Sequence, residues 1–201
     1  GILLASGSAT RFGSNKLLHV LDSGNEMAIQ SALNIAPYVD LLVCVIRPED
    51  QELKSLLKQK LEHTNYRIVE NPDHKSGMGS SIKTAIKNCL DSEYWMITLA
   101  DMPFITHSTL AKIKQRCVEQ LAHPTENRKI IRPVYLDDQN IPGHPVAFPH
   151  RHQDALLGIA GDEGARSILK NNPVEKLRVE DIGVIRDIDR VSDLAPGLPK
   201  R

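Results

Sequence analysis

The sequence has no excess of either charge, few cysteines, few aromatic residues and no long hydrophobic run. Lysine and arginine total 25 and aspartate and glutamate also total 25, which argues against a broad surface for nucleic acid or anionic membrane. No apolar run approaches the roughly 20 residues that span a bilayer, and no signal peptide is recognisable. We therefore expect a soluble, cytoplasmic protein with neither a nucleic-acid partner nor a membrane partner.

The three cysteines are odd in number, widely separated and without a Cys-x-x-Cys pair, which argues against a disulfide framework. Cys44 lies inside the apolar run LLVCVI, while Cys89 and Cys117 continue apolar stripes at helical spacing. Small core residues in a reducing compartment are favoured over catalytic or disulfide-bonded cysteines. The single tryptophan, Trp95, is likewise assigned to the core.

A length of 201 residues fits one domain with a sizeable core. We expect this domain to span residues 1–194, with a disordered tail at 195–201, because APGLPKR has no periodicity. Gly1 already lies inside an apolar run and is not a methionine, so we expect further residues to precede it.

Short apolar runs alternate with helical periodicity along the chain, which is typical of a parallel sheet covered on both faces. Strands are expected at residues 1–5, 40–46, 66–70, 94–100, 129–135, 145–149, 174–179 and 183–188. Helices are expected at residues 26–36, 49–62, 79–91, 107–122 and 162–170. The predicted fold class is α/β, a Rossmann-like three-layer α/β/α sandwich with a mostly parallel sheet.

The loop at residues 5–16 directly follows the first strand and contains Gly7, Gly13, Arg11 and Lys16. Glycines let backbone N–H groups approach an anion, and the two cations can neutralise phosphate oxygens. The loop lacks the Gly-Lys-Ser/Thr of a P-loop and the Gly-x-Gly-x-x-Gly of a dinucleotide site. Taken alone, it is equally well interpreted as a glycine-rich turn.

Carboxylates follow two other predicted strands. Asp101 comes directly after the run 95–100, where capping a turn is the alternative to holding a cation. The i, i+2 spacing of Asp187 and Asp189 places both on one face of the last predicted strand. If that strand is parallel, its end meets Asp101 at the carboxyl rim of the sheet, where ligands of such folds bind. Phosphate-binding cations beside paired carboxylates for magnesium predict a nucleoside triphosphate site.

Six segments together resemble the MobA-like nucleotidyltransferases, and specifically their molybdenum cofactor cytidylyltransferase branch. In order they are LLASGSATRFGSNK, NPDHKSGMGSSI, LADMPFI, GHPVAF, GDEGAR and DIDRVSDL. Each segment alone is weak evidence for the family, but six segments in the right order over nearly the whole chain are specific to it. The resemblance implies a sandwich of the nucleotide-diphospho-sugar transferase type.

The resemblance also implies a role for each matched position. Lys16, Arg11 and Asp101 would be the catalytic residues, and Asp101 would hold magnesium with Asp189 or Asp187. The residues that would bind the nucleotide are Leu4, Ala5, Ser6, Gly7, Arg11, Lys16, Asn71, Gly77, Ser80 and Ser81. Ser80 or Ser81 would open a helix whose dipole favours anions. The acceptor side would be formed by Gly143, His144, Pro145, Asp162 and Gly164.

A turn and a helix N-cap at Asp162 are the structural alternative for the acceptor segments. Two positions depart from the family pattern. Ser6 stands where family members that use cytidine nucleotides have Ala and those that use guanosine nucleotides have Gly. Arg190-Val191 stands where the family usually has Thr-Pro after the second aspartate. For the histidines of His150-Arg151-His152, a solvated surface turn is favoured over a metal site.

The implied reaction is transfer of CMP from CTP, or another nucleoside triphosphate, to a phosphorylated acceptor such as molybdopterin, with magnesium as cofactor. An ionised phosphate acceptor needs alignment and charge neutralisation rather than a general base. The product would go to a molybdenum hydroxylase. The alternatives are a guanylyltransferase, a cytidylyltransferase acting on a sugar or alcohol phosphate, and a non-catalytic carrier of the molybdenum cofactor.

Overall fold

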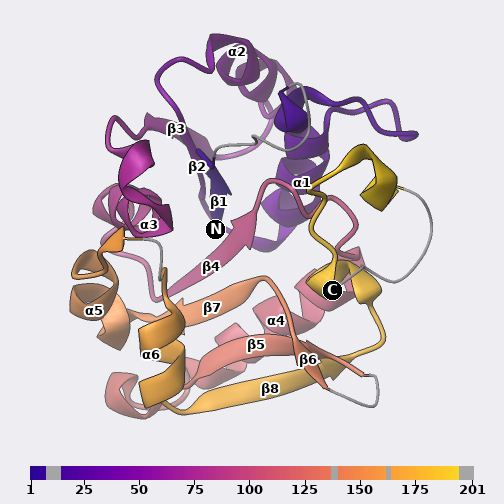
Figure 1. Cartoon of the computed structure of the whole chain (residues 1–201). Coiled ribbons are helices and arrows are strands. Elements are labelled where there is room, and N and C mark those ends of the chain that lie inside the picture. The colour runs from indigo at the N-terminus through magenta and orange to yellow at the C-terminus, as the bar shows by residue number, and fades with distance from the viewer. Residues whose placement is uncertain (8–14, 137–139, 162–163, 195–201) are drawn as a thin grey trace.

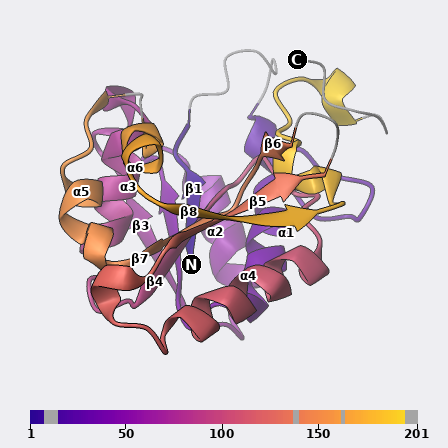
Figure 2. The ribbon, with the colours of Figure 1, turned by 90° about the horizontal axis from the view of Figure 1, so that it is seen from below.

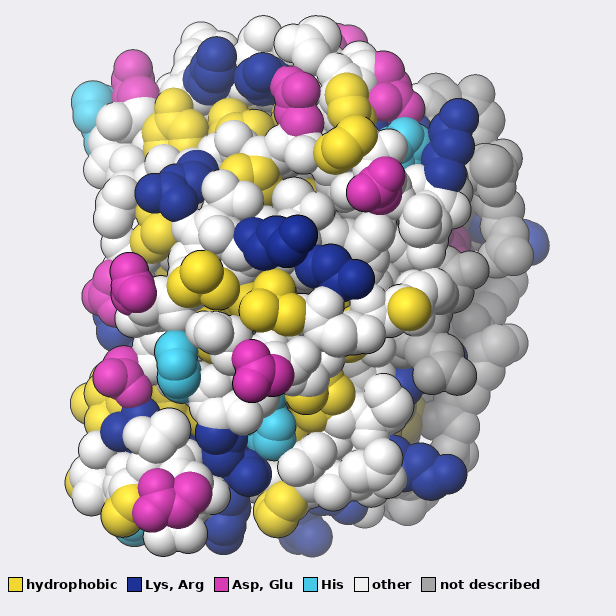
Figure 3. All heavy atoms as spheres, turned by 90° about the vertical axis from the view of Figure 1, so that its left-hand side faces the viewer, with side chains coloured by type: hydrophobic (Ala, Val, Ile, Leu, Met, Phe, Trp, Pro, Cys, Tyr) yellow, Lys and Arg dark blue, Asp and Glu magenta, His cyan; other side chains and the backbone are white. Residues whose placement is uncertain are grey.

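The structure is a computed structural model that describes residues 1–7, 15–136, 140–161 and 164–194. Arg11, Asp162 and the predicted tail at 195–201 therefore lie outside the described residues. Within the described ranges, no helix has the length and apolar character needed to cross a membrane. Figure 3 shows cationic and anionic side chains interspersed on the side of the molecule that carries α3 and α5.

One mixed sheet forms the centre of the protein (Figure 1). Its strands are β1 (Ile2–Ala5), β2 (Leu42–Ile46), β3 (Tyr66–Glu70), β4 (Tyr94–Leu99), β5 (Ile130–Tyr135), β6 (Ile141–Pro142), β7 (Val146–Pro149) and β8 (Val174–Val179). The strand order is β3-β2-β1-β4-β7-β5-β6, with β8 paired to β5. Only β6 and β7 run against the others, so the predicted mostly parallel sheet is confirmed.

Helices cover both faces of the sheet, which gives the three predicted layers (Figure 2). On one face lie α1 (Met27–Ile35), α2 (Gln51–Lys60) and α4 (His107–Gln120). On the other lie α3 (Met78–Lys87), α5 (Gln153–Leu157) and α6 (Arg166–Asn171). Alternate residues of β1 point to opposite faces, so Leu3 packs in the first layer and Leu4 in the second.

The predicted strand at 183–188 is wrong. Ile182–Ile185 forms a 3₁₀ helix, and an irregular segment follows it. The backbone N–H of Ile188 donates to the carbonyl oxygen of Asp101 at 3.0 Å, so this segment crosses the end of the sheet instead of joining it. Two short elements, β6 and α5, were not predicted because they are too brief to show periodicity.

The cysteine and tryptophan predictions agree with the packing, whereas the prediction for the histidine pair is wrong in part. All three cysteines are free, and burial raises the pKa of Cys44 and Cys117 to about 12, so both remain unreactive thiols. Trp95 is fully buried. His152, predicted to be solvated, is only 4% exposed and packs edge-on against Phe148.

Candidate active site

A cavity of about 650 Å³ lies at the carboxyl ends of β1, β2 and β4. Nine of the predicted site residues line it: Leu4, Ala5, Ser6, Gly7, Lys16, Gly77, Ser81, Asp101 and Asp189. They come from four segments that are far apart in the sequence. The parallel strands bring their ends to one edge of the sheet, and this edge is where the cavity opens.

Lys16 joins the two carboxylates at the centre of this cavity. Its Nζ donates to Asp101 Oδ2 at 2.8 Å and to Asp189 Oδ1 at 2.9 Å. Burial alone would lower the pKa of Lys16, but the charges and hydrogen bonds of Asp101 and Asp189 outweigh burial and raise it. Lys16 is therefore a fixed cation at physiological pH.

Asp101 is the residue best placed to take a further cation. Its backbone is held at the end of β4, because the neighbouring Ala100 N–H donates to the carbonyl of Leu4 at 3.0 Å. Its Oδ2 is paired with Lys16, while its Oδ1 is buried and accepts no hydrogen bond from the described residues. A buried carboxylate oxygen without a partner is costly unless a ligand satisfies it.

A hydrogen-bonded set of polar side chains includes two serines that line the same cavity, Ser6 and Ser81. Ser6 Oγ and Ser81 Oγ lie 2.6 Å apart. Asn71 Nδ2 donates to Ser80 Oγ at 2.8 Å and to Ser81 Oγ at 3.0 Å. Asn71 is 1% exposed, and neither it nor Ser80 lines the cavity. Asn71 and Ser80 are therefore placed to position Ser81 and, through Ser81, Ser6.

The helix that carries these serines begins slightly earlier than predicted. Helix α3 starts at Met78 after Gly77, so Ser80 and Ser81 lie inside its first turn instead of opening it. Gly77 has φ +94°, a conformation that favours glycine, and it lines the cavity at the helix N-terminus. Gly77, the first glycine of GMGSS, is thus needed for the turn that places Ser81.

A second cavity of about 520 Å³ adjoins the first. Both are lined by Leu4, Met78 and Leu99, and the second also by Asp187, His144 and Gly164. The prediction that Asp187 and Asp189 share one face is wrong, because their segment is not a strand and the two carboxylates line different cavities. Burial raises the pKa of Asp187, and the negative charges of Asp101 and Asp189 raise it further.

Two residues predicted on the acceptor side pack away from this second cavity. A Cβ on Gly143 would lie 2.3 Å from the carbonyl oxygen of Val184, so this glycine allows two backbone segments to approach closely. Pro145 is buried and lines neither cavity. Of the segment GHP, only His144 faces the space where an acceptor could bind.

Sequence reasoning did not name six residues that line the two cavities: Arg47, Glu49, His74, Lys75, Arg132 and Arg166. Three of them nevertheless lie in matched segments, His74 and Lys75 in NPDHKSGMGSSI and Arg166 in GDEGAR. Arg47 directly follows β2, so its position after a strand could have revealed it. It forms a bidentate pair with Asp50, with both N···O distances at 2.7 Å. Arg166 is the last residue of the matched segment GDEGAR, so that segment could have revealed it, whereas Arg132 has no such signal because only the tertiary structure places it beside His144.

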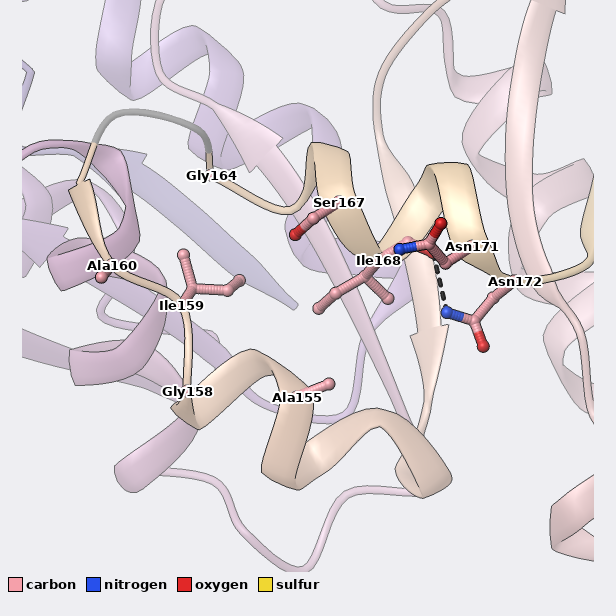
Figure 4. Close-up of a pocket in the computed structure, with 9 residues that line it drawn as sticks. All are labelled: Ala155, Gly158, Ile159, Ala160, Gly164, Ser167, Ile168, Asn171 and Asn172. Atoms are coloured by element: carbon pink, nitrogen blue, oxygen red, sulfur yellow. Dashed lines mark hydrogen bonds between the residues drawn. The ribbon is translucent and has the colours of Figure 1, made fainter.

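A third hollow of about 460 Å³ lies between α5 and α6 (Figure 4). Its polar side chains are Ser167, Asn171 and Asn172, and none of its described lining residues is charged.

The fold and the first cavity together define a class of protein. A mostly parallel sheet that presents a buried lysine, paired carboxylates and a glycine turn at its carboxyl edge is typical of nucleotide-binding α/β proteins. The MobA-like NTP transferase domain matches residues 1–178. The chain belongs to this family, which confirms the resemblance, and it is a nucleotidyltransferase similar to molybdenum cofactor cytidylyltransferase.

Individual relatives are distant but extend over most of the chain. Molybdenum cofactor cytidylyltransferase from Escherichia coli K12 is 24% identical over 194 residues, covering 96% of this chain and 91% of the relative. The crystal structure of Rv0371c from Mycobacterium tuberculosis H37Rv matches with a TM-score of 0.73 and 21% identity, over 96% of this chain and 94% of that one. A manganese complex of Rv0371c matches with a TM-score of 0.66 and 20% identity, over 89% of this chain and 86% of that one.

Proposed function

We propose that this protein transfers CMP from CTP to the phosphate of molybdopterin and releases pyrophosphate. An oxygen of the acceptor phosphate attacks the α-phosphorus, and the bond from that phosphorus to the β-phosphate oxygen breaks. The observation that carries the proposal is the meeting of Lys16, Asp101 and Asp189 beside Ser6 and Gly7 at the carboxyl edge of the sheet.

The donor set fits a divalent ion, for which we propose magnesium. The described residues contain no cluster of three His, Cys, Asp or Glu side chains that could hold a metal ion, so these residues alone do not form a closed metal site. Magnesium instead takes one or two carboxylates together with substrate phosphates, which Asp101 and Asp189 could provide. The buried, unpaired Oδ1 of Asp101 supports this assignment. When bound, the ion would neutralise charge on the triphosphate.

Lys16 and the first loop would hold the triphosphate. The ammonium of Lys16 can turn from the carboxylates to phosphate oxygens and stabilise the charge that develops on the leaving pyrophosphate. Backbone N–H groups near Gly7 and Gly77 can approach phosphate closely. Arg11 is proposed to supply a second cation, although it lies outside the described residues. The acceptor is ionised near neutral pH, so no side chain is needed as a general base.

Ser6 is proposed to contact the nucleobase. Asn71 Nδ2 donates to Ser81 Oγ, so Ser81 can donate its own proton to Ser6. Ser6 then keeps its O–H and a lone pair for the ligand. Together with the cytidylyltransferase relative, this favours CTP. The acceptor would enter through the second cavity, with Asp187, His144 and Gly164 beside it. A molybdenum hydroxylase is the proposed recipient of the product.

The test measures pyrophosphate release with molybdopterin, magnesium and each of CTP, GTP, ATP and UTP. CTP should be the preferred nucleotide, and Asp101→Asn should lower the turnover rate by about 100- to 1,000-fold because a charge-stabilising group is lost. Asp91→Asn is the matched control, since Asp91 is exposed and away from both cavities.

Preference for GTP would contradict the assignment of CTP and favour a guanylyltransferase. Turnover only with a sugar or alcohol phosphate would contradict the assignment of molybdopterin as the acceptor. Binding of molybdopterin without pyrophosphate from any nucleotide would favour a carrier and overturn the proposed reaction.

A further inference from the structure

Asp189 reaches the first cavity from a segment that has no regular secondary structure. Residues 186–189 follow the 3₁₀ helix Ile182–Ile185 and belong to neither a helix nor a strand. The side chain of Asp189 is 49% exposed, so packing does not fix its direction. Asp101, by contrast, directly follows β4, where strand pairing holds the backbone. Asp189 therefore depends on contacts of its own backbone to stay beside Lys16.

The residue before Asp189 is anchored to the end of the sheet. The N–H of Ile188 donates to the carbonyl oxygen of Asp101 at 3.0 Å, and the Ile188 side chain is fully buried in a small cluster with Leu21 and Met27. This anchor fixes where the segment lies. The backbone direction at Asp189 is then set by the residues that follow it.

Asp193 binds the backbone of Asp189 directly. Its Oδ2 accepts the N–H of Asp189 at 3.1 Å and the N–H of Arg190 at 2.8 Å, and its own N–H donates to the carbonyl oxygen of Arg190 at 3.0 Å. Hydrogen bonds to a carboxylate are stronger than those between neutral groups. The bond to Arg190 resembles the capping of a helix start by an acidic side chain, here at the 3₁₀ helix Val191–Leu194. The bond to Asp189 goes beyond such a cap.

Arg186 holds Asp193 from the other side. Its Nη2 donates to the carbonyl oxygens of Asp193 at 2.8 Å and of Leu194 at 3.1 Å. Its guanidinium carbon lies 4.3 Å from the ring centroid of Phe104, in the chain that follows β4, which is a favourable cation–π contact. Asp193 lines neither of the two cavities. Any influence of Asp193 on the site therefore acts through Asp189.

We propose that Asp193 is a positioning residue, which fixes the backbone of Asp189 so that the Asp189 carboxylate is directed at Lys16 and at the metal ion. Arg186 keeps Asp193 in place for this task. The inference rests on the proposed function, because it assigns Asp189 to the metal. A role limited to capping the 3₁₀ helix would change stability and leave metal binding as it is.

The experiment measures manganese binding to the full chain by electron paramagnetic resonance, without nucleotide or acceptor. Asp193→Ala should weaken binding by about tenfold or more, the scale expected when a partner that orients a metal ligand is removed. Asp193→Asn keeps a side-chain oxygen for the two N–H groups and should stay within about threefold of wild type. Asp91→Ala is the matched control and should bind like wild type, since Asp91 is exposed and lines neither cavity.

Arg186→Met provides a second variant, so the test stands if Asp193→Ala does not fold. Methionine keeps an aliphatic side chain beside Phe104 but loses the donors to both carbonyls, so manganese binding should weaken by about threefold or more. Wild-type affinity in both folded variants would overturn the inference, as would wild-type protein that binds no manganese. Equal weakening by Asp193→Asn and Asp193→Ala would assign the effect to charge and overturn it too.

Pyrophosphate release with molybdopterin and each nucleotide is measured on the same samples. The expected pattern of manganese affinities in a protein that releases no pyrophosphate would refute the proposed function alone. Pyrophosphate release by wild type, with manganese affinity unchanged in folded Asp193→Ala, would refute the inference alone.

Discussion

Lys16 occupies the space between the carboxylates that are proposed to hold the metal. Its Nζ lies within 2.9 Å of both Asp101 and Asp189 and offsets one of their two negative charges. A metal ion would compete with this ammonium for the same oxygens. Nucleotide would relieve the competition, because its phosphates offer Lys16 another partner. In the proposed reaction, Lys16 would thus couple metal binding to nucleotide binding.

Replacing Lys16 with Met should therefore strengthen metal binding while it abolishes catalysis. With nucleotide absent, Lys16→Met should bind manganese at least about fivefold more tightly than wild type, because a competing cation is gone. Turnover should fall by about 100-fold or more because charge on the leaving group is no longer neutralised. Manganese binding is measured by electron paramagnetic resonance.

Lys54→Met is the control, since its ion pair with Glu70 lies on the surface outside both cavities. A Lys16→Met protein that binds manganese no more tightly than wild type would contradict the proposed competition.

The 3₁₀ helix Ile182–Ile185 positions the segment that carries Asp187 and Asp189. Asp181 fixes this helix at its start by accepting hydrogen bonds from Gly183 N–H at 3.0 Å and from Thr106 N–H at 2.8 Å. A Cβ on Gly183 would lie 2.1 Å from the carbonyl oxygen of Phe104. The helix and the chain after β4 therefore touch through backbone, and this contact brings Asp189 to Asp101.

Gly183→Ala should separate these two segments. The added methyl group would meet backbone that cannot move aside, so we expect a loss of about 3 kcal/mol in the free energy of unfolding. Turnover should also fall, because Asp189 is displaced from Lys16. Urea denaturation and pyrophosphate release measure the two effects.

Gly158→Ala serves for comparison, because its nearest neighbour would be 3.2 Å away and its φ of −83° suits alanine. We expect it to change stability by less than about 1 kcal/mol. Equal stability of the two variants would refute the close backbone contact.

Two histidines link the stability of the whole molecule to pH. Burial, followed by the charge of a neighbouring arginine, lowers the pKa of both His144 and His152 to about 4. In the unfolded chain these groups titrate near pH 6.5. Between these values the unfolded chain binds more protons than the folded protein, so the free energy of unfolding decreases as the pH falls from 6.5 towards 4.

His152→Phe should reduce this pH dependence. Phenylalanine keeps a ring against Phe148 and cannot bind a proton, so the loss between pH 7 and pH 5 should shrink by up to about 2 kcal/mol. Chemical denaturation at the two pH values measures the difference. An unchanged loss would show that His152 does not titrate as its burial indicates.

Periodicity was sufficient to predict the layered fold. The apolar runs at β1 to β4 and the helical stripes of α1 to α4 are long, and each lies within a few residues of its predicted position. Asp101 and Lys16 could be predicted as site residues because each follows a buried strand. Asn71 shows the limit of such reasoning. Its position directly after β3 predicts a contact with the ligand, but in the structure it is buried behind Ser81 and donates a hydrogen bond to it.

The sequence by itself determined the alternation of strands and helices, the family and the residue types at the ends of the parallel strands, because these depend on local pattern and on motif order. Only the tertiary structure decided which side chains meet. Asp187 and Asp189 are two residues apart, yet line different cavities, because their segment crosses the sheet end under the constraint of Gly183. Arg132 likewise lines one cavity with Arg166, 34 positions later in the matched segment GDEGAR, and nothing in the sequence around Arg132 indicates this because long-range packing, unlike periodicity, leaves no local signal.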